Sequence, residues 1–225
     1  MTVMSTAPFA MRPLHEGPVP QAASVLAVTS RPGQESEYLG GVLYAFRRAG
    51  ANLGLLCLSR GEASPLNSMR YAHLEAVRPW ELQLAASVLG ISSVMVASYP
   101  DGALHRQPHD ELAGRVLRAI RQHCADLLLV IAPEVGTSGD VAVAAAARAA
   151  ARHAGVPVVA STAPETPGAW VIDLGSEADT ARAIQKAAAA AHESQSQELP
   201  RVLQRLDLLS RGEAVRWLVF PPPMP

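Results

Sequence analysis

Hydrophobic residues along this chain gather in short unbroken runs that are separated by longer segments of mixed polarity. The apolar runs predict strands at residues 23–29, 52–59, 93–98, 126–133, 156–161 and 169–175. The mixed segments predict helices at about 36–49, 69–89, 110–123, 139–154 and 178–193. Most strand-like runs lack polar alternation, which is typical of strands covered on both faces. This order predicts an α/β fold with a mostly parallel sheet and helices on both faces.

The same pattern predicts one domain over residues 23–219. Residues 1–22 contain several prolines and no apolar segment of signal-peptide length, so they are expected to form a flexible N-terminal arm. Residues 220–225 are a proline-rich tail that cannot continue a strand.

Composition excludes several kinds of partner. The chain has 225 residues, a net charge of −1 and only 4% aromatic residues, which argues against nucleic acid as a partner. No segment has the uncharged apolar length that a membrane span needs, so we expect a cytoplasmic protein without a membrane partner. Cys57 and Cys124 lie in apolar segments and are expected to be buried free thiols.

Polar loops follow the strand-like runs at residues 30–36, 59–70, 99–111 and 133–140. In open α/β sheets, ligands bind outside the carboxyl ends of the strands, so these loops predict a ligand site. They hold nine charged or titratable candidates: Arg31, Glu35, Arg60, Glu62, Asp101, His105, His109, Glu134 and Asp140. Taken singly, many of these are equally explained as turn or cap residues, Asp140 as a helix cap among them.

Motifs for three common chemistries are missing from these loops. The first loop has no G-x-G-x-x-G dinucleotide pattern, and no G-x-S-x-G nucleophile elbow is present. The third chemistry, zinc-dependent hydrolysis, needs metal ligands at a recognisable spacing, which these loops do not show. His105 and His109 stand four residues apart in a proline-containing loop, where two solvated histidines are the simpler explanation. The residues alone therefore do not identify a reaction.

Several short segments match a known family in order and spacing. They are "VLAV" (25–28), "GG" (40–41), "LLCLSRGEA" (55–63), "EAVRPWEL" (75–82), "YPDG" (99–102), "DLLLVIAPEVG" (126–136) and "AIQKAAAAAHESQ" (183–195). In these features the chain resembles the LmbE-like, or PIG-L, family of zinc-dependent N-acetylglucosaminyl-type deacetylases over about residues 23–217. The resemblance implies a Rossmann-like, LmbE-like α/β sandwich.

The first catalytic motif of that family is altered here. The family has A-H-P-D-D-E after the first strand; its histidine and second aspartate bind zinc, and its first aspartate is the general base. The corresponding residues are "SRPGQE" (30–35). Arg31 replaces the histidine, Gly33 the base and Gln34 the ligand aspartate. Only the proline and Glu35 are retained.

The second motif, H-P-D-H, corresponds to "TSGD" (137–140). Thr137 thus replaces a histidine implied to stabilise the transition state, and Asp140 replaces the last zinc ligand. A guanidinium has no lone pair for a metal, and glycine has no side chain to accept a proton. The resemblance therefore implies that the zinc site is lost, with no metal ligand and no other cofactor.

The altered loop predicts a pocket whose charge has changed sign. We expect Arg31 to occupy part of the vacated metal space and to pair with Glu35 or Asp140. Alternatively, Arg31 binds an anion by charge-assisted hydrogen bonds, with Arg60 and Arg78 nearby. The residues expected to bind a small anionic or sugar-like ligand are Arg31, Gln34, Arg78, Asp101, Thr137 and His192.

Two functions follow from these expectations. One is a non-catalytic homologue with a ligand-binding or accessory role, by analogy in bacterial natural-product or small-molecule biosynthesis. The other is an active enzyme, a deacetylase, an amide hydrolase or another metal-free catalyst, that uses Glu35, Asp140 or His192 as acid or base. A homo-oligomer fits either function.

Overall fold

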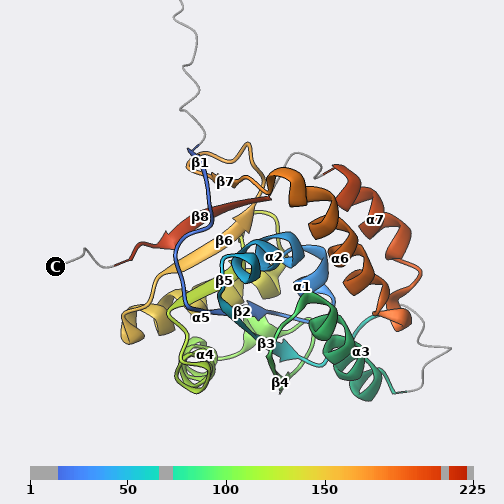
Figure 1. Cartoon of the computed structure of the whole chain (residues 1–225). Helices are drawn as coiled ribbons and strands as arrows, with labels where there is room; N and C mark the ends of the chain where they lie inside the picture. The colour runs from blue at the N-terminus through green and yellow to red at the C-terminus, as the bar shows by residue number, and fades with distance from the viewer. Residues whose placement is uncertain (1–14, 66–72, 209–212, 222–225) are drawn as a thin grey trace, which may run out of the picture.

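A computed structural model describes residues 15–65, 73–208 and 213–221. The chain forms an eight-stranded sheet in the order β1-β7-β8-β6-β5-β2-β3-β4 (Figure 1). The strands are β1 (His15–Gly17), β2 (Ser24–Thr29), β3 (Asn52–Ser59), β4 (Ser93–Tyr99), β5 (Leu127–Ile131), β6 (Val158–Thr162), β7 (Trp170–Ile172) and β8 (Glu213–Val219). All neighbouring pairs are parallel except those of β8, which runs antiparallel to both β6 and β7. The predicted fold class is confirmed.

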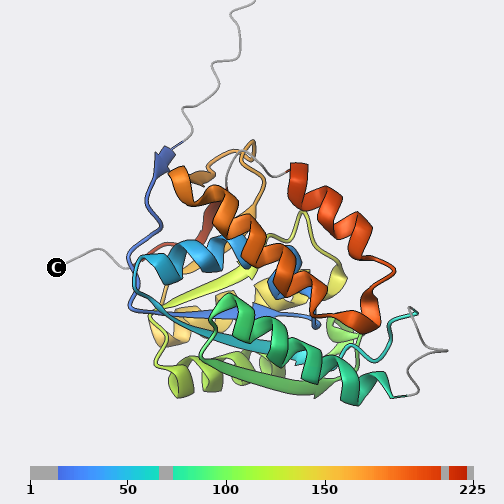
Figure 2. The ribbon, with the colours of Figure 1, turned by 45° about the vertical axis from the view of Figure 1, so that its right-hand side comes forward.

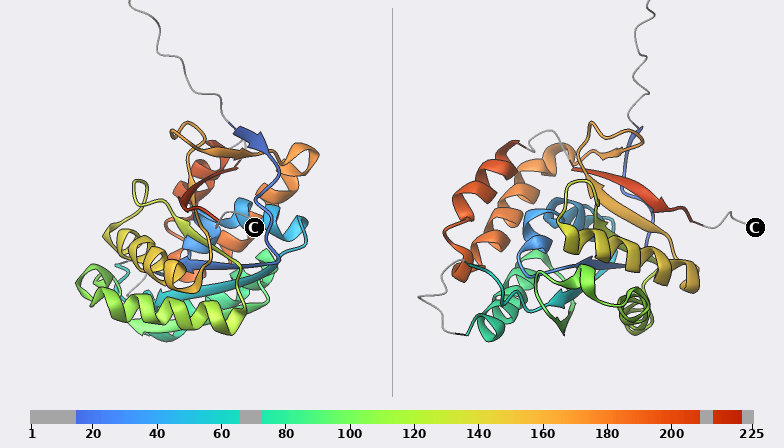
Figure 3. Two further views of the ribbon diagram at one scale, coloured as in Figure 1. Left: turned by 90° about the vertical axis from the view of Figure 1, so that its left-hand side faces the viewer. Right: turned by 180° about the vertical axis from the view of Figure 1, so that it is seen from behind.

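Helices cover both faces of the sheet, as Figures 2 and 3 show. They are α1 (Gln34–Glu37), α2 (Gly40–Arg48), α3 (Leu74–Leu89), α4 (His109–His123), α5 (Ser138–Ala154), α6 (Ala178–Ala190) and α7 (Leu199–Leu208). The side chains of α2, α3 and α6 pack on one face in a core that includes Phe46 and Leu82. Those of α4 and α5 pack on the other face, in a second core that includes Val116 and Ala147. The continuous apolar runs thus become central strands that are buried on both faces.

The start of α2 passes unusually close to two polar side chains. An added Cβ at Gly41 in α2 would lie 2.0 Å from Glu213 Oε1, and one at Gly40 would lie 2.6 Å from the side chain of Gln185. The paired glycines therefore allow the start of α2 to approach α6 and β8. This close approach is the physical reason for "GG" at this point of the chain.

Several predicted boundaries are wrong. The helix expected over 36–49 is divided into α1 and α2, and α3 begins at Leu74, while residues 66–72 lie outside the described part of the chain. The helix α7 was not predicted, because "SQSQELP" before it has the composition of a loop.

Within the expected arm, His15–Gly17 pairs in parallel with β7 and Val19 is buried, so residues 15–22 belong to the fold. Residues 1–14 and 222–225 lie outside the described chain.

The two cysteines differ in environment. Cys57 is buried in β3 as predicted, and burial, the largest influence, raises the pKa of its thiol to about 12. Cys124 is exposed, which corrects the prediction, because it ends α4 in a left-handed conformation with φ 53°. No helix in the described residues is long and apolar enough to cross a membrane.

Candidate functional site

The polar loops lie where the order of strands in the sheet reverses. From β2 the chain continues outward to β3 and β4, and then returns to β5 on the other side of β2. The loops after β2 and β5 therefore part at the carboxyl end of β2, which is the usual ligand position in an open α/β sheet. That a ligand binds here stays a prediction.

The turn from β2 into α1 depends on a glycine. Gly33 has φ 99°, a left-handed conformation that side chains other than glycine rarely adopt. Its carbonyl accepts a hydrogen bond of 3.0 Å from the backbone N–H of Glu37, which closes the first turn of α1. Gly33 therefore has a conformational role, in addition to lacking a side chain that could take a proton.

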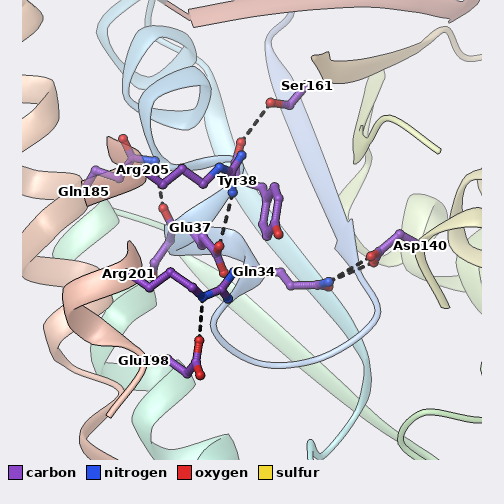
Figure 4. Close-up of polar contacts among 10 residues, drawn as sticks. Gln34, Glu37, Tyr38, Asp140, Ser161, Gln185, Glu198, Arg201 and Arg205 are labelled. Carbon is purple, nitrogen blue, oxygen red and sulfur yellow. Dashed lines mark hydrogen bonds and ion pairs between the residues drawn. The ribbon is translucent and has the colours of Figure 1, made fainter. Parts of the chain in front are cut away.

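Gln34 and Asp140 join the two altered motifs directly (Figure 4). The side-chain amide of Gln34 donates to both carboxylate oxygens of Asp140, at 2.9 and 3.1 Å. Gln34 Oε1 accepts hydrogen bonds from the backbone N–H of Ser30 at 3.0 Å and of Arg31 at 3.3 Å. Both side chains are buried, so this pair locks the loop after β2 against the start of α5.

Asp140 also caps α5. Its Oδ2 accepts hydrogen bonds from the backbone N–H of Thr137 at 2.7 Å and from the Thr137 hydroxyl at 2.9 Å. The hydroxyl of Ser30 lies 2.8 Å from Asp140 Oδ1 and 2.8 Å from Gln34 Oε1, and its single proton serves one of them at a time. The carboxylate of Asp140 is thus surrounded by donors from its own chain.

Glu35 forms a second buried cluster with His192. Glu35 is fully buried, and its Oε1 lies 2.7 Å from His192 Nε2 and accepts a 2.7 Å hydrogen bond from the Ser36 hydroxyl. Its Oε2 accepts a 2.8 Å hydrogen bond from the backbone N–H of Gly33. Burial alone would raise the pKa of Glu35, but the charge and hydrogen bond of His192, with the bond from Ser36, hold it below its ordinary value.

Helix α3 positions both sides of the site through Arg78 and Glu81. The buried guanidinium of Arg78 donates to the backbone carbonyls of Gly61 at 2.6 Å and Pro32 at 2.7 Å. Glu81 accepts hydrogen bonds of 2.6 Å from both the backbone N–H and the hydroxyl of Ser194, and so holds the segment that carries His192. Burial lowers the pKa of Arg78; nearby Asp101 opposes this shift, and the positive charge of Arg31 adds to it.

These elements enclose a pocket of about 300 Å³. Its charged and titratable lining residues are Arg31, Glu37, Arg78, His192, Glu198 and Arg201. Two of the acids already have partners on α7: Glu37 is 3.3 Å from Arg205, and Glu198 is 2.6 Å from Arg201 (Figure 4). Once these two ion pairs are set aside, the charge in the pocket wall that remains for a ligand is positive.

Arg31 does not make the ion pair that we expected. The hydrogen-bonding sites of Glu35 are taken by His192, Ser36 and Gly33, and those of Asp140 by Gln34, Ser30 and Thr137. The guanidinium of Arg31 has no hydrogen-bond or ion-pair partner within the described residues, and it lies partly exposed in the pocket wall. Each carboxylate already has donors of its own, so neither offers Arg31 a place.

The remaining predicted ligand-binding residues separate into two groups. Arg31, Gln34, Arg78 and His192 line the pocket. Asp101 is outside its lining, because its carboxylate accepts hydrogen bonds from the Ser59 hydroxyl at 3.1 Å and the backbone N–H of Ala63 at 3.2 Å. Thr137 and Asp140 also lie outside the lining, where they cap α5.

Sequence reasoning missed the wall that the C-terminal segment contributes. Gln195, Glu198, Leu199, Arg201 and Val202 all line the pocket, from the end of α6 to α7. The only signal for them is the amphipathic spacing of "LPRVLQRLDL", which was masked by the polar residues before it. Glu37, in α1, was missed because it follows the motif.

The residues at the two altered motifs do not suit a zinc ion. Zinc in proteins is bound by histidine, cysteine and carboxylate side chains. Here Arg31 has no lone pair, the Gln34 amide group directs its N–H donors at Asp140, and that carboxylate is occupied. Across residues 15–65, 73–208 and 213–221 no group of three or more His, Cys, Asp and Glu side chains is placed to hold a metal ion.

Comparison with known proteins gives one family match. A family model described as PIG-L, GlcNAc-PI de-N-acetylase, matches residues 26–151, which is more than half of the chain. No curated protein matches the sequence.

Solved structures resemble the whole fold. A deacetylase triple mutant of the teicoplanin biosynthetic pathway has 19% sequence identity and a TM-score of 0.70, over 90% of this chain and 100% of that one. The 4-carboxy-2-hydroxymuconate hydratase from Pseudomonas putida KT2440 has 18% identity and a TM-score of 0.66, over 90% and 98%. The N,N'-diacetylchitobiose deacetylase from Pyrococcus horikoshii has 13% identity and a TM-score of 0.62, over 90% and 86%. At these identities the likeness concerns the fold.

Proposed function

This chain belongs to the PIG-L, GlcNAc-PI de-N-acetylase, family, and from that premise we propose that it is a divergent, metal-free member that binds a small anionic ligand. The ligand is a carboxylate- or phosphate-bearing molecule of the size of a monosaccharide. The role is accessory to small-molecule metabolism, without zinc-dependent deacetylation.

One observation carries this proposal. The guanidinium of Arg31 stands in the pocket wall without an acidic partner in the described chain, beside the buried cation Arg78. An arginine is always charged, and a charge at a partly buried position gains most from a charge-assisted hydrogen bond. An anion supplies that bond, whereas a metal cation at the same place would be repelled.

The binding experiment uses inorganic phosphate, glucosamine 6-phosphate and uncharged N-acetylglucosamine as probes, each titrated calorimetrically into the full chain. We expect a phosphate-bearing probe to bind and the uncharged sugar to bind at least ~10-fold more weakly, because one charge-assisted hydrogen bond is worth a factor of this order. Arg31→Gln is expected to weaken binding by ~10-fold or more, and Arg31→Lys by less.

Arg60→Gln is the matched control, since Arg60 is exposed, follows the next strand and lies outside the pocket lining. The same preparation is expected to contain substoichiometric zinc by elemental analysis. Equal binding of the charged and uncharged probes, an Arg31→Gln variant that binds like the parent chain, or one zinc per chain would each contradict the proposal.

A second function is favoured by His192. The ionised Glu35 can only accept hydrogen bonds, so His192 Nε2 carries the proton between them, and Nδ1 is the ring nitrogen left to exchange a proton with a ligand. Nδ1 is buried and has no partner among the described residues, although His192 belongs to the pocket wall. This arrangement favours a general acid or base for metal-free chemistry, and the fold also hosts a protein named as a hydratase.

Turnover separates the two functions. We expect no acetate release from acetylated amino sugars in the presence of a chelator. Chelator-resistant turnover that is lost in His192→Gln, while phosphate affinity is kept, would establish the enzyme in place of the binding protein.

A further inference from the structure

Helix α3 is apolar on the side that faces away from the core. Its inner residues include Leu82, Ala85 and Leu89, all buried. Its outer side carries an apolar stripe, which we define as Ala76, Trp80, Leu84 and Val88 at helical spacing of four. Trp80 is 64% exposed, Leu84 40% and Val88 38%. Glu75, Gln83 and Ser87 are also exposed on this helix, so polar side chains border the stripe, an arrangement typical of an interaction site.

Helix α4 on the other face of the sheet does not share this property. On α4, the outer residues Asp110, Glu111, Arg118 and Arg121 are charged and exposed. On α3, from Pro79 to its end, the only charged side chain is Glu81, which is buried against Ser194. The outer side of α3 from Pro79 onward therefore lacks the charge that the outer side of α4 carries.

The strand beside this helix is an open edge. β4 is the last strand of the sheet, and it pairs on one side only, with β3, among the described residues. Figures 1 and 2 show α3 and β4 at the same margin of the molecule. The sequence of β4, "SVMVASY", has no charge or proline, and Val94, Met95 and Val96 are only partly buried. Charged residues and prolines are the usual means of blocking an edge strand, and β4 lacks both.

We propose that β4 and the stripe on α3 form an interface between two copies of this chain. Antiparallel pairing of β4 with β4 of the partner satisfies both open edges at once and is related by a two-fold axis. This axis is perpendicular to the sheet, so the face that carries α3 lies on the same side in both copies. The two α3 helices therefore meet as well. The joined sheet is then continuous through both copies.

Charge and size both favour a second copy as the occupant. A surface without charged side chains can meet its own copy without repulsion between like charges. A helix stripe of four residues is too small for a stable interface, which needs about 800 Å² from each partner. Adding the edge of β4 brings the contact toward that size, and Trp80 is the residue type that most often dominates such contacts. At the end of β4, Arg60 bonds to Ser98 at 3.1 Å and to the Glu75 carbonyl, so its charge marks the border of the interface.

The test is the mass of the full chain in solution by light scattering after size exclusion, over a range of concentrations. We expect twice the chain mass of 23.7 kDa. Trp80→Lys and Leu84→Lys, two exposed positions, are each expected to raise the concentration for half-association by at least ~10-fold. Val141→Lys, at a residue of α5 that is 47% exposed, is the matched control and is expected to leave association unchanged.

Hydrogen exchange provides the measurement for the strand. The amides of β4 are expected to exchange more slowly as the concentration rises through the association range, and Trp80→Lys is expected to remove that dependence. A monomer at all concentrations, a dimer that withstands both lysine substitutions, or β4 amides that exchange independently of concentration would overturn the proposal. Unchanged circular dichroism of the variants excludes misfolding as the cause.

Discussion

At the scale of the residue, the side chains of the two altered motifs bond directly to one another. A family zinc site requires side chains that direct lone pairs at one point. Here the amide of Gln34 directs donors at Asp140, so two former ligand positions satisfy each other. Arg31 is left out of that network and faces the pocket instead. These contacts support the proposal that the pocket binds an anion in place of a metal cation.

The cluster of Glu35 predicts a pH dependence of stability. Its folded pKa lies below the ordinary 4.5, so its contribution to stability is present above that pH and is lost as the pH falls through the folded pKa. We expect Glu35→Gln to lower the free energy of unfolding by roughly 1–3 kcal/mol at pH 7, with the difference shrinking below about pH 4.5. Urea unfolding of the parent chain and the variant between about pH 7 and pH 3.5 measures this difference in the free energy of unfolding.

Glu193→Gln is the control, because Glu193 is exposed and next to His192 in sequence. A deficit of Glu35→Gln that stayed constant from pH 7 to pH 3.5 would mean that the carboxylate charge is not the cause.

At the scale of the element, helix packing around the site depends on positions where a side chain has no room. Gly40 and Gly41 let α2 approach Gln185 and Glu213. Glu213 is buried and pairs with Arg182 at 3.0 Å, and burial, opposed by that arginine, raises the pKa of its carboxyl group. The Gln185 amide donates to the Ser36 carbonyl at 2.8 Å, so α6 is tied directly to α1. Displacement of either side chain therefore disturbs the elements that carry the pocket.

Two glycines in helices are predicted to respond in opposite ways to alanine. Gly41→Ala is expected to destabilise the fold by roughly 1–3 kcal/mol, because its Cβ would lie 2.0 Å from Glu213 Oε1. Gly114→Ala, in α4, meets its nearest atom at 3.7 Å and is expected to stabilise by roughly 0.4–1 kcal/mol through the reduced entropy of the unfolded chain. Chemical denaturation of both variants measures this, and a shift of the same sign in both would refute the packing argument.

At the scale of the whole molecule, the pocket joins segments from distant parts of the chain. The residues that line the pocket range from Arg31 to Val202 in the sequence. Helix α3 contributes Arg78 from its inner side, while the outer side of the same helix carries the apolar stripe. Ligand site and proposed interface are therefore two sides of one helix. β8 runs antiparallel between β6 and β7 and so joins these two strands into one sheet.

The sequence by itself determined the fold class, and it predicts the loop after β2 as the site and the absence there of the family's usual metal ligands. These depend on local features: unbroken apolar runs, the place of "SRPGQE" after a strand, and side-chain types that have or lack a lone pair. The division of α1 from α2, the helix α7 and the strand β1 escaped prediction because their local signals are short or resemble loops.

Only the tertiary structure decided which side chains meet. Glu35 has its partner His192 157 positions away, and Gln34 has its partner Asp140 106 positions away. Near residue 31, Gly33 and Ser36 also donate to Glu35, and Ser30 also donates to Asp140. The sequence shows these donors but not the approach of His192 and Asp140, because that approach depends on how distant segments pack against the loop after β2.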